Sequence, residues 1–130
     1  DLMMNLNARS AFILSRAVLP QMLSQGSGRI VHTAARAALA GTANHSVYNA
    51  SKSVVVRLVE SMAAEYKHQG ITANCVLPGT IDTPQNRAEM PNADWSKWVP
   101  PAAIADAFVF LASDAAAHIT GAALPVYGRS

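Results

Sequence analysis

The sequence has a single cysteine, Cys75, among its 130 residues, which excludes an intramolecular disulfide and fits a reducing cytoplasm. Only 14% of the residues are charged, and the ten Lys and Arg form no basic stripe with interleaved aromatics. No apolar run is long enough to span a membrane, and the first residues lack the pattern of a secretory signal. The four histidines show no metal-ligand spacing. We therefore expect a cytoplasmic protein with no metal site, nucleic-acid partner or membrane contact.

The chain instead has a regular alternation of apolar helices and short strands. The apolar patterns predict helices at about 2–24, 46–68 and 100–113, and strands at about 29–34, 71–77 and 121–127. Between the second strand and the last helix, residues 80–99 hold two prolines and two tryptophans and predict a long irregular loop. Pro125 indicates that the last strand lies at a sheet edge or ends there. The alternation predicts an α/β fold in which about three parallel strands carry helices on both faces.

The helices at 2–24 and 46–68 are apolar on more than one side. One side of each helix can cover the sheet, and the other side also avoids water. The pattern favours a homodimer or homotetramer in which these helices pack against their copies. The alternative is that another part of a larger domain covers them.

Tyr48 and Lys52 are four residues apart, which places a phenol and an ammonium on one helix face. An isolated tyrosine titrates near pH 10, far from the range where general acid–base catalysis is efficient. A neighbouring cation favours the phenolate. The pair is therefore a candidate proton-transfer device, although the same spacing also occurs on ordinary helix surfaces.

Several motifs occur in a fixed order along the chain: Asn7 in the first helix, Gly28-Arg29-Ile30-Val31, Tyr48-Asn49-Ala50-Ser51-Lys52, Pro78-Gly79-Thr80-Ile81-Asp82-Thr83, and Leu111-Ala112-Ser113-Asp114 before Thr120-Gly121. The ordered set resembles the second half of the short-chain dehydrogenase/reductase family, which are Rossmann-fold oxidoreductases that use NAD or NADP. The resemblance covers essentially all 130 residues. It implies the C-terminal half of a doubly wound parallel sheet and hydride transfer to a small-molecule substrate.

The resemblance also implies roles for individual residues. Tyr48 is the general acid or base, and Lys52 lowers the tyrosine pKa and binds the nicotinamide ribose. Asn7 matches the helix asparagine that holds a water connected to the lysine; alternatively it is a polar residue that bends the helix. Pro78 and Gly79 match the turn that lets the backbone approach the nicotinamide.

The nicotinamide carboxamide is expected to contact two further residues. The resemblance implies that the backbone of Ile81 and the hydroxyl of Thr83 hold it. The alternative for Thr83 is a turn residue before Pro84.

The chain departs from the family pattern at two places. The catalytic serine position, thirteen residues before Tyr48, is Ala35, which cannot donate a hydrogen bond to a substrate oxygen. Thr33, two positions earlier, is an alternative donor or simply a β-branched strand residue. No Gly-x-Gly-x-x-Gly string occurs anywhere. We therefore expect residues 1–130 to be a single partial Rossmann-type domain that lacks the N-terminal glycine-rich half.

The string from Val76 to Arg87, followed by 90–95, resembles dihydropteridine reductases, which also have the Tyr–Lys pair without the serine. A quinonoid or pterin substrate needs less polarisation than a simple ketone, so the substrate is expected to be a carbonyl or a quinonoid ring. Trp95 and Trp98 are expected either to cover the substrate or to anchor their loop. Two rival hypotheses are a truncated, non-catalytic α/β oligomerisation module and a half-enzyme that needs a partner chain.

Overall fold

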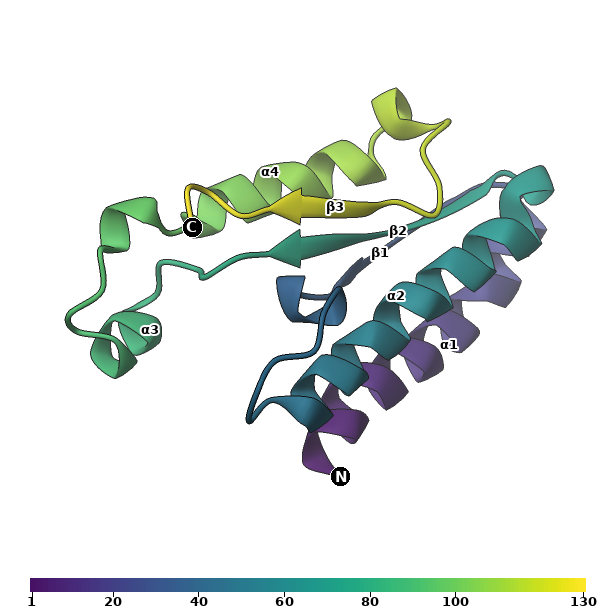
Figure 1. Ribbon diagram of the computed structural model, residues 1–130. Coiled ribbons are helices and arrows are strands. Elements are labelled where there is room, and N and C mark those ends of the chain that lie inside the picture. The colour runs from purple at the N-terminus through teal and green to yellow at the C-terminus, as the bar shows by residue number, and fades with distance from the viewer.

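A computed structural model describes residues 1–130. Helices and strands alternate along the chain (Figure 1), in the order α1 (Ser10–Gln25), β1 (Gly28–Thr33), α2 (Ser46–Tyr66), β2 (Ile71–Pro78), α3 (Pro84–Glu89), α4 (Pro101–Ala112) and β3 (Ala123–Val126). Gly26 ends α1 and Gly70 follows α2, both with the positive φ that glycine adopts without steric cost. The predicted helices and strands are confirmed, with boundaries shifted by a few residues.

The three strands form one parallel sheet in the order β1-β2-β3. Helices α1 and α2 lie side by side on one face of the sheet, and α4 covers the other face (Figure 1). This confirms the predicted parallel sheet with helices on both faces. Pro125 lies in β3, an edge strand, where its missing N–H leaves no gap in the sheet.

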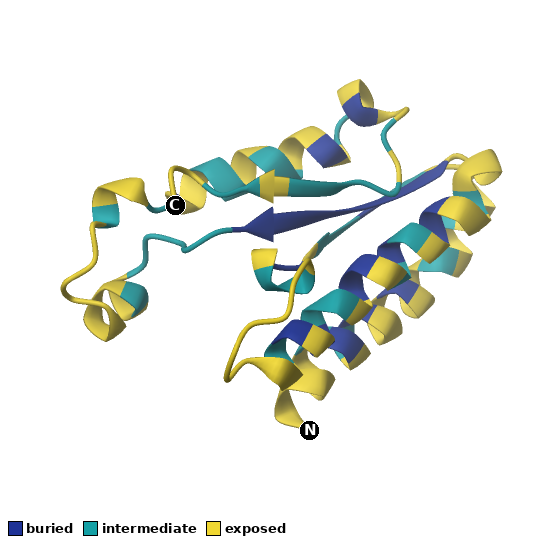
Figure 2. Cartoon of the chain, viewed as in Figure 1, coloured by how far each residue is buried: buried dark blue, intermediate teal, exposed yellow.

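The central strand β2 is buried along its whole length (Figure 2). Successive strand side chains point to opposite faces, so residues 71, 73, 75 and 77 share one face. These four belong to a cluster of twelve buried residues packed between the sheet and helices α1 and α2. The alternating residues 72, 74 and 76 point to the opposite face, which α4 covers. A strand buried on both faces explains why β2 reads as a short, mostly apolar run.

One buried polar side chain joins β2 to the segment before β3. Asn74 is fully buried, its amide nitrogen donates to the carbonyl of Ile119 at 2.9 Å, and its oxygen accepts from the N–H of Ala122 at 2.9 Å. Thr120 adds a third link, because its hydroxyl accepts from the N–H of Ala73. A buried amide with both ends paired avoids the desolvation penalty of an unpaired group.

The structure differs from the sequence prediction at two places. Residues 80–99 are not simply irregular, because they contain helix α3 and a short 3₁₀ turn at Trp95–Lys97. Pro84 opens α3 at a position where a missing N–H costs nothing, and the Thr83 hydroxyl caps it by accepting from the N–H of Asn86 at 3.1 Å. The first predicted helix begins with a π-helical turn at Met4–Arg9 before α1.

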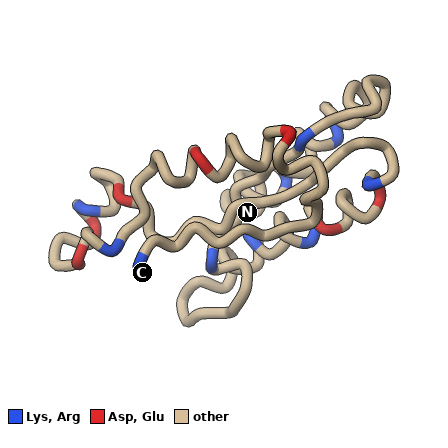
Figure 3. The backbone as a smooth tube through the Cα atoms, turned by 90° about the horizontal axis from the view of Figure 1, so that it is seen from above, with Lys and Arg blue, Asp and Glu red and all other residues tan.

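Charged residues are unevenly distributed along the chain (Figure 3). Helix α4 carries only Asp106, and its exposed side includes Val109 and Phe110. None of the helices combines the length and the apolar content that crossing a membrane requires.

Candidate active site

A cleft of about 630 Å³ opens at the carboxyl ends of β1 and β2. Its walls come from the segments that follow these two strands, the start of α2, the chain's first residues and α3. The lining includes six residues predicted from the sequence: Ala35, Tyr48, Lys52, Pro78, Gly79 and Ile81. In open parallel sheets, ligands bind outside the carboxyl ends of the strands. The structure therefore brings most of the predicted site residues together at the place where this fold binds ligands.

Tyr48 and Lys52 project from the first two turns of α2 into this cleft. Both side chains are partly exposed, so a ligand in the cleft can reach them. The ammonium of Lys52 donates to the carbonyl of Thr33, the last residue of β1, at 3.3 Å. Burial lowers the pKa of Lys52 from its usual value. The lysine is thus anchored to the end of β1 beside the tyrosine.

Asn7 does not contact Lys52 in the structure. Its amide nitrogen donates to the hydroxyl of Ser51 at 3.0 Å, and this hydroxyl donates to the carbonyl of Tyr48 at 2.9 Å. Asn7 lies in the π-helical turn at Met4–Arg9, a distortion that is frequent near functional sites. The contact ties this turn to the segment of α2 that carries Tyr48 and Lys52, and a water link to the lysine stays a prediction.

The turn after β2 approaches the cleft with its backbone. The N–H of Gly79 donates to the carbonyl of Val126 at 2.9 Å, which fixes the turn to the end of β3. The carbonyl of Ile81 accepts from the amide of Asn86 at 2.8 Å, whereas the N–H of Ile81 has no acceptor in the chain. That N–H is available to a ligand. The Thr83 hydroxyl is occupied as the cap of α3 and does not line the cleft.

Ala35 lines the cleft at the end of β1, at the position of the missing serine. It is 8% exposed and supplies only a methyl group. Thr33 also lines the cleft, and its backbone carbonyl holds Lys52. The structure therefore places no hydroxyl at position 35.

Trp95 lies outside the cleft lining. Its indole N–H donates to the carbonyl of Met90 at 2.9 Å, and the Arg87 guanidinium lies 4.7 Å from its ring centroid. Arg87 also makes a two-point ion pair with Asp82, and the Trp98 ring lies 6.4 Å from Trp95. These contacts fit loop anchoring, and contact with substrate stays a prediction.

The sequence reasoning missed several residues that line the cleft, among them His45, Asn86, Glu89 and Met90. His45 precedes Tyr48 by three residues, and the spacing of His45, Tyr48 and Lys52 is that of one helix face. That periodicity was a usable signal. The residues of α3 gave no comparable signal, because the loop around them was expected to be irregular.

Comparison with known proteins supports the same interpretation. A family model described as enoyl-(acyl carrier protein) reductase matches residues 1–128. The rat protein dehydrogenase/reductase SDR family member 6 is 36% identical over 143 residues, which cover 98% of this chain and 58% of the rat protein. The 2-(R)-hydroxypropyl-CoM dehydrogenase of Xanthobacter autotrophicus is 38% identical over 138 residues, covering 98% of this chain and 55% of that enzyme.

Solved structures show the same similarity. The gluconate 5-dehydrogenase of Burkholderia cenocepacia, in complex with NADP and tartrate, superposes with a TM-score of 0.85 at 29% identity, over 94% of this chain and 52% of that one. A 4-hydroxyisoleucine dehydrogenase mutant, complexed with NADH and succinate, gives a TM-score of 0.88 at 29% identity, over 97% of this chain and 56% of that one. The chain spans a little over half the length of the curated relatives it matches. On these matches, the chain belongs to the short-chain dehydrogenase/reductase family.

Proposed function

We propose that residues 1–130 carry the catalytic end of an NAD(P)-dependent oxidoreductase. The observation that carries this proposal is the shared cleft at the carboxyl ends of β1 and β2, lined by Tyr48, Lys52, Gly79 and Ile81. The residues form a partial Rossmann-type domain, and the glycine-rich half that would bind the pyrophosphate belongs outside them. The buried, unpaired Cys75 supports the prediction of a cytoplasmic protein.

Three residues of the chain have separate roles in proton transfer. Tyr48 donates a proton to the substrate oxygen or nitrogen in reduction and accepts it in oxidation. Lys52 lines the same cleft one helical turn after Tyr48 and supplies the positive charge of the pair. Asn7 is a positioning residue, because it acts through Ser51 on the turn of α2 that holds both side chains.

The cleft fits a nicotinamide and its ribose. Lys52 uses one of its three N–H groups on Thr33, which leaves two for ribose hydroxyls. The free N–H of Ile81 matches a carboxamide oxygen. When bound, the cofactor supplies or accepts the hydride. The Thr83 hydroxyl accepts from the N–H of Asn86 in the cap of α3 and keeps its own O–H, which can donate to the carboxamide.

Ala35 guides the proposal for the substrate. Without a hydroxyl at this position, a ketone oxygen loses one stabilising donor as negative charge develops on it. A quinonoid ring, such as that of a pterin, is already an activated electrophile and needs this donor less. We therefore rank quinonoid substrates beside carbonyl substrates. Ala35→Ser should raise turnover of a ketone more than turnover of a quinonoid substrate, and equal effects on both would contradict this explanation.

The central experiment replaces Tyr48 by phenylalanine in the purified protein. Turnover, followed by the absorbance of the reduced nicotinamide, should fall about 10²- to 10⁴-fold while the circular dichroism spectrum stays that of the parent. The control is Tyr66→Phe, on the same helix but outside the cleft. Parent-level turnover in Tyr48→Phe would end the assignment.

Ala35 also favours a second candidate, a non-catalytic oligomerisation module or a half-enzyme that a partner chain completes. Cofactor binding discriminates between these possibilities. If NADH and NADPH fluorescence stay unchanged by the protein at about millimolar cofactor, the upper range of ordinary affinity, the chain does not work alone as a dehydrogenase. Recovery of binding on adding a chain with a glycine-rich βαβ unit would support the half-enzyme.

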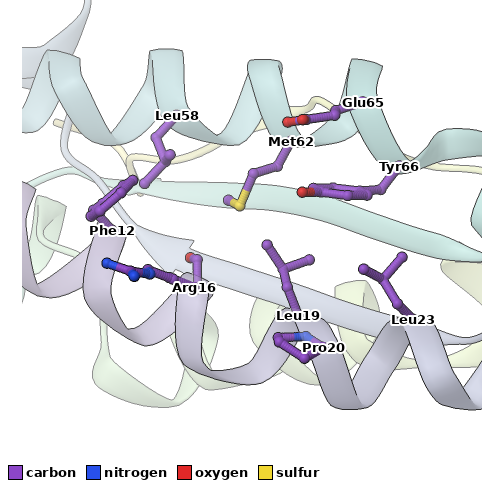
Figure 4. Close-up of a pocket in the computed structure, with 10 residues that line it drawn as sticks. Phe12, Arg16, Leu19, Pro20, Leu23, Leu58, Met62, Glu65 and Tyr66 are labelled. Carbon is purple, nitrogen blue, oxygen red and sulfur yellow. The ribbon is translucent and has the colours of Figure 1, made fainter.

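We also propose self-association through α1 and α2. A groove of about 320 Å³ lies between these helices, and its lining is mostly apolar. Figure 4 shows the side chains that face each other across it: Phe12, Leu19 and Leu23 from α1, and Leu58, Met62 and Tyr66 from α2. A copy of the same helices would remove the exposed members of this set, Phe12 and Leu23, from water. Light scattering of Phe12→Glu against the parent tests this, and an unchanged mass would contradict it.

A further inference from the structure

A second polar cavity lies at the end of the sheet opposite the catalytic cleft. It has a volume of about 440 Å³, and residues 26–29, 67–72 and 117–120 contribute its lining. These segments contain or precede the first residues of the three strands. Because the strands are parallel, this cavity and the cleft lie at opposite ends of the same strands. The proton-transfer residues play no part in it.

The charges around this cavity all have one sign. Arg29 and Lys67 line it together with the imidazole of His118, and none of its lining residues is Asp or Glu. Hydroxyl groups also line it, from Ser27, Thr72 and Thr120. A lining that contains cations and hydroxyl donors but no acidic residue favours an anion over a cation or an apolar ligand.

Two buried polar atoms in the lining have no partner. Thr72 is 5% exposed, and its hydroxyl oxygen makes no hydrogen bond; the Nε of Arg29 is likewise buried and unpaired. Arg29 and Thr72 are register partners on β1 and β2, so their side chains emerge on the same face of the sheet. Buried polar groups almost always pair with protein, water or ligand, so these two atoms are available to a group that enters the cavity.

The backbone adds further donors. The N–H groups of His118 and Thr120 have no acceptor in the chain. The presence of a lysine at position 67 has a separate explanation, because a cation directly after α2 complements the helix dipole. The helix-dipole explanation does not apply to Arg29 or Thr72, because both lie in strands.

We propose that this cavity binds a tetrahedral oxyanion of the phosphate class. The guanidinium of Arg29, whose Nη1 also donates to the carbonyl of Gly28, supplies its unpaired Nε–H, Lys67 supplies a mobile charge, and the buried Thr72 hydroxyl supplies a further donor. The anion links the segments that enter β1, β2 and β3. Its binding therefore stabilises the sheet from the end remote from the cleft.

The test measures the thermal midpoint of the purified protein in sodium phosphate and in sodium chloride of equal ionic strength. Phosphate at about 10 mM should raise Tm by about 2 °C or more relative to chloride. The charge-removing variant Lys67→Gln should lose most of this response, because Lys67 is exposed and its replacement leaves the fold intact. The matched control is Lys97→Gln, an exposed lysine outside the cavity, which should keep the full response.

Thr72→Val gives a second and sharper measurement. Valine has nearly the shape of threonine and removes the unpaired hydroxyl, so this variant should melt higher than the parent in chloride and respond less to phosphate. A threonine with no role in anion binding would give the higher Tm in chloride and leave the phosphate response unchanged, so the loss of that response is the deciding result. An equal Tm of the parent in phosphate and chloride would overturn the proposal, as would a full phosphate response in both Lys67→Gln and Thr72→Val.

The source of the phosphate group is a separate arm of the same experiment. Inorganic phosphate and a small phosphomonoester, such as phenyl phosphate, are compared at equal concentration. Equal shifts indicate a site for the free ion, and a larger shift with the ester indicates a phosphorylated small molecule. Both results support a phosphate site, because each requires the response to disappear in Lys67→Gln.

Discussion

Replacing Gly79 by alanine should destabilise the protein by about 1–3 kcal/mol, the usual cost of overpacking. The added Cβ would lie 2.9 Å from Nη2 of Arg36 and 3.0 Å from both Cα and the carbonyl oxygen of Tyr127. Arg36 cannot move away freely, because its guanidinium stacks 3.9 Å from the Tyr127 ring centroid and donates to the carbonyl of Ser130. The turn itself is held by the bond from Gly79 to Val126. Backbone must therefore shift.

Gly41→Ala is the matched control. A Cβ at Gly41 meets nothing within 4 Å, and the residue does not have a positive φ. Alanine leaves the unfolded chain fewer backbone conformations than glycine does, so this variant should be as stable as the parent or up to about 1 kcal/mol more stable. Urea unfolding followed by circular dichroism separates the two, because a loss of about 2 kcal/mol moves the midpoint by about 1 M at an ordinary m-value. The reasoning fails if Gly79→Ala and Gly41→Ala unfold at the same urea concentration as the parent.

The same substitution also tests the cleft. The turn that carries Gly79 lines it together with Ile81, whose N–H is free. A shifted turn should weaken NADH binding in Gly79→Ala by about tenfold or more, whereas Gly41→Ala should bind like the parent. Fluorescence titration measures both.

Three further predictions follow from buried titratable groups. Lys52 lines the cleft, so Lys52→Met should cut turnover about 10²- to 10⁴-fold. Burial lowers the pKa of Lys52, which means that its charged form is disfavoured in the native state; the urea midpoint should therefore not fall, and a clear loss of stability would contradict this. Burial also lowers the pKa of His32, whose ring lies 2.7 Å from the Ser15 hydroxyl. The native state then binds fewer protons than the unfolded chain, so this contribution to stability is complete above pH 6.5 and declines as the pH falls below it. As the pH is lowered below 6.5, the urea midpoint should therefore fall less in His32→Gln than in the parent. The same fall in both proteins would refute the assignment to His32. Burial and the charge of Glu60 raise the pKa of Cys75 to about 11, so a thiol reagent should modify it only after unfolding; rapid labelling of native protein would show otherwise.

Much of the fold was predictable because each strand and helix has a strong local signal. The apolar runs at 29–34 and 71–77, with glycines before them, mark the two longer strands to within a residue. The parallel direction of the strands and the presence of helices on both faces follow from the alternation of helices and strands. Local signals and the final fold agree in these segments, so packing had nothing to override.

The segment 80–99 shows where sequence reasoning fails. Two prolines and two tryptophans suggested an irregular loop, yet Thr83 and Pro84 form an ordinary helix start. The Thr83 hydroxyl, expected at the cofactor, also caps α3 by accepting from the N–H of Asn86, and its contact with the cofactor stays a prediction. The contacts of Trp95 with Arg87 and with the carbonyl of Met90 fit the expected alternative of loop anchoring, and contact with substrate stays a prediction.

Asn7 shows a different limit. Its contact with Ser51 spans 44 residues, and it depends on a π-helical turn that has no distinct sequence pattern. The Tyr48–Lys52 spacing was visible from the sequence alone. The burial of Lys52 and its bond to Thr33 needed the position of β1 relative to α2. Contacts between distant elements are the part that periodicity does not encode.

The paired amide of Asn74 sets an order of assembly for the sheet. β3 is four residues long, and its approach to the sheet depends on Ile119 and Ala122 finding the two ends of that amide. The amide has its native position only after the middle strand has settled between its helices. We therefore expect the C-terminal edge of the sheet to form after the middle strand during folding and to detach early when the protein opens.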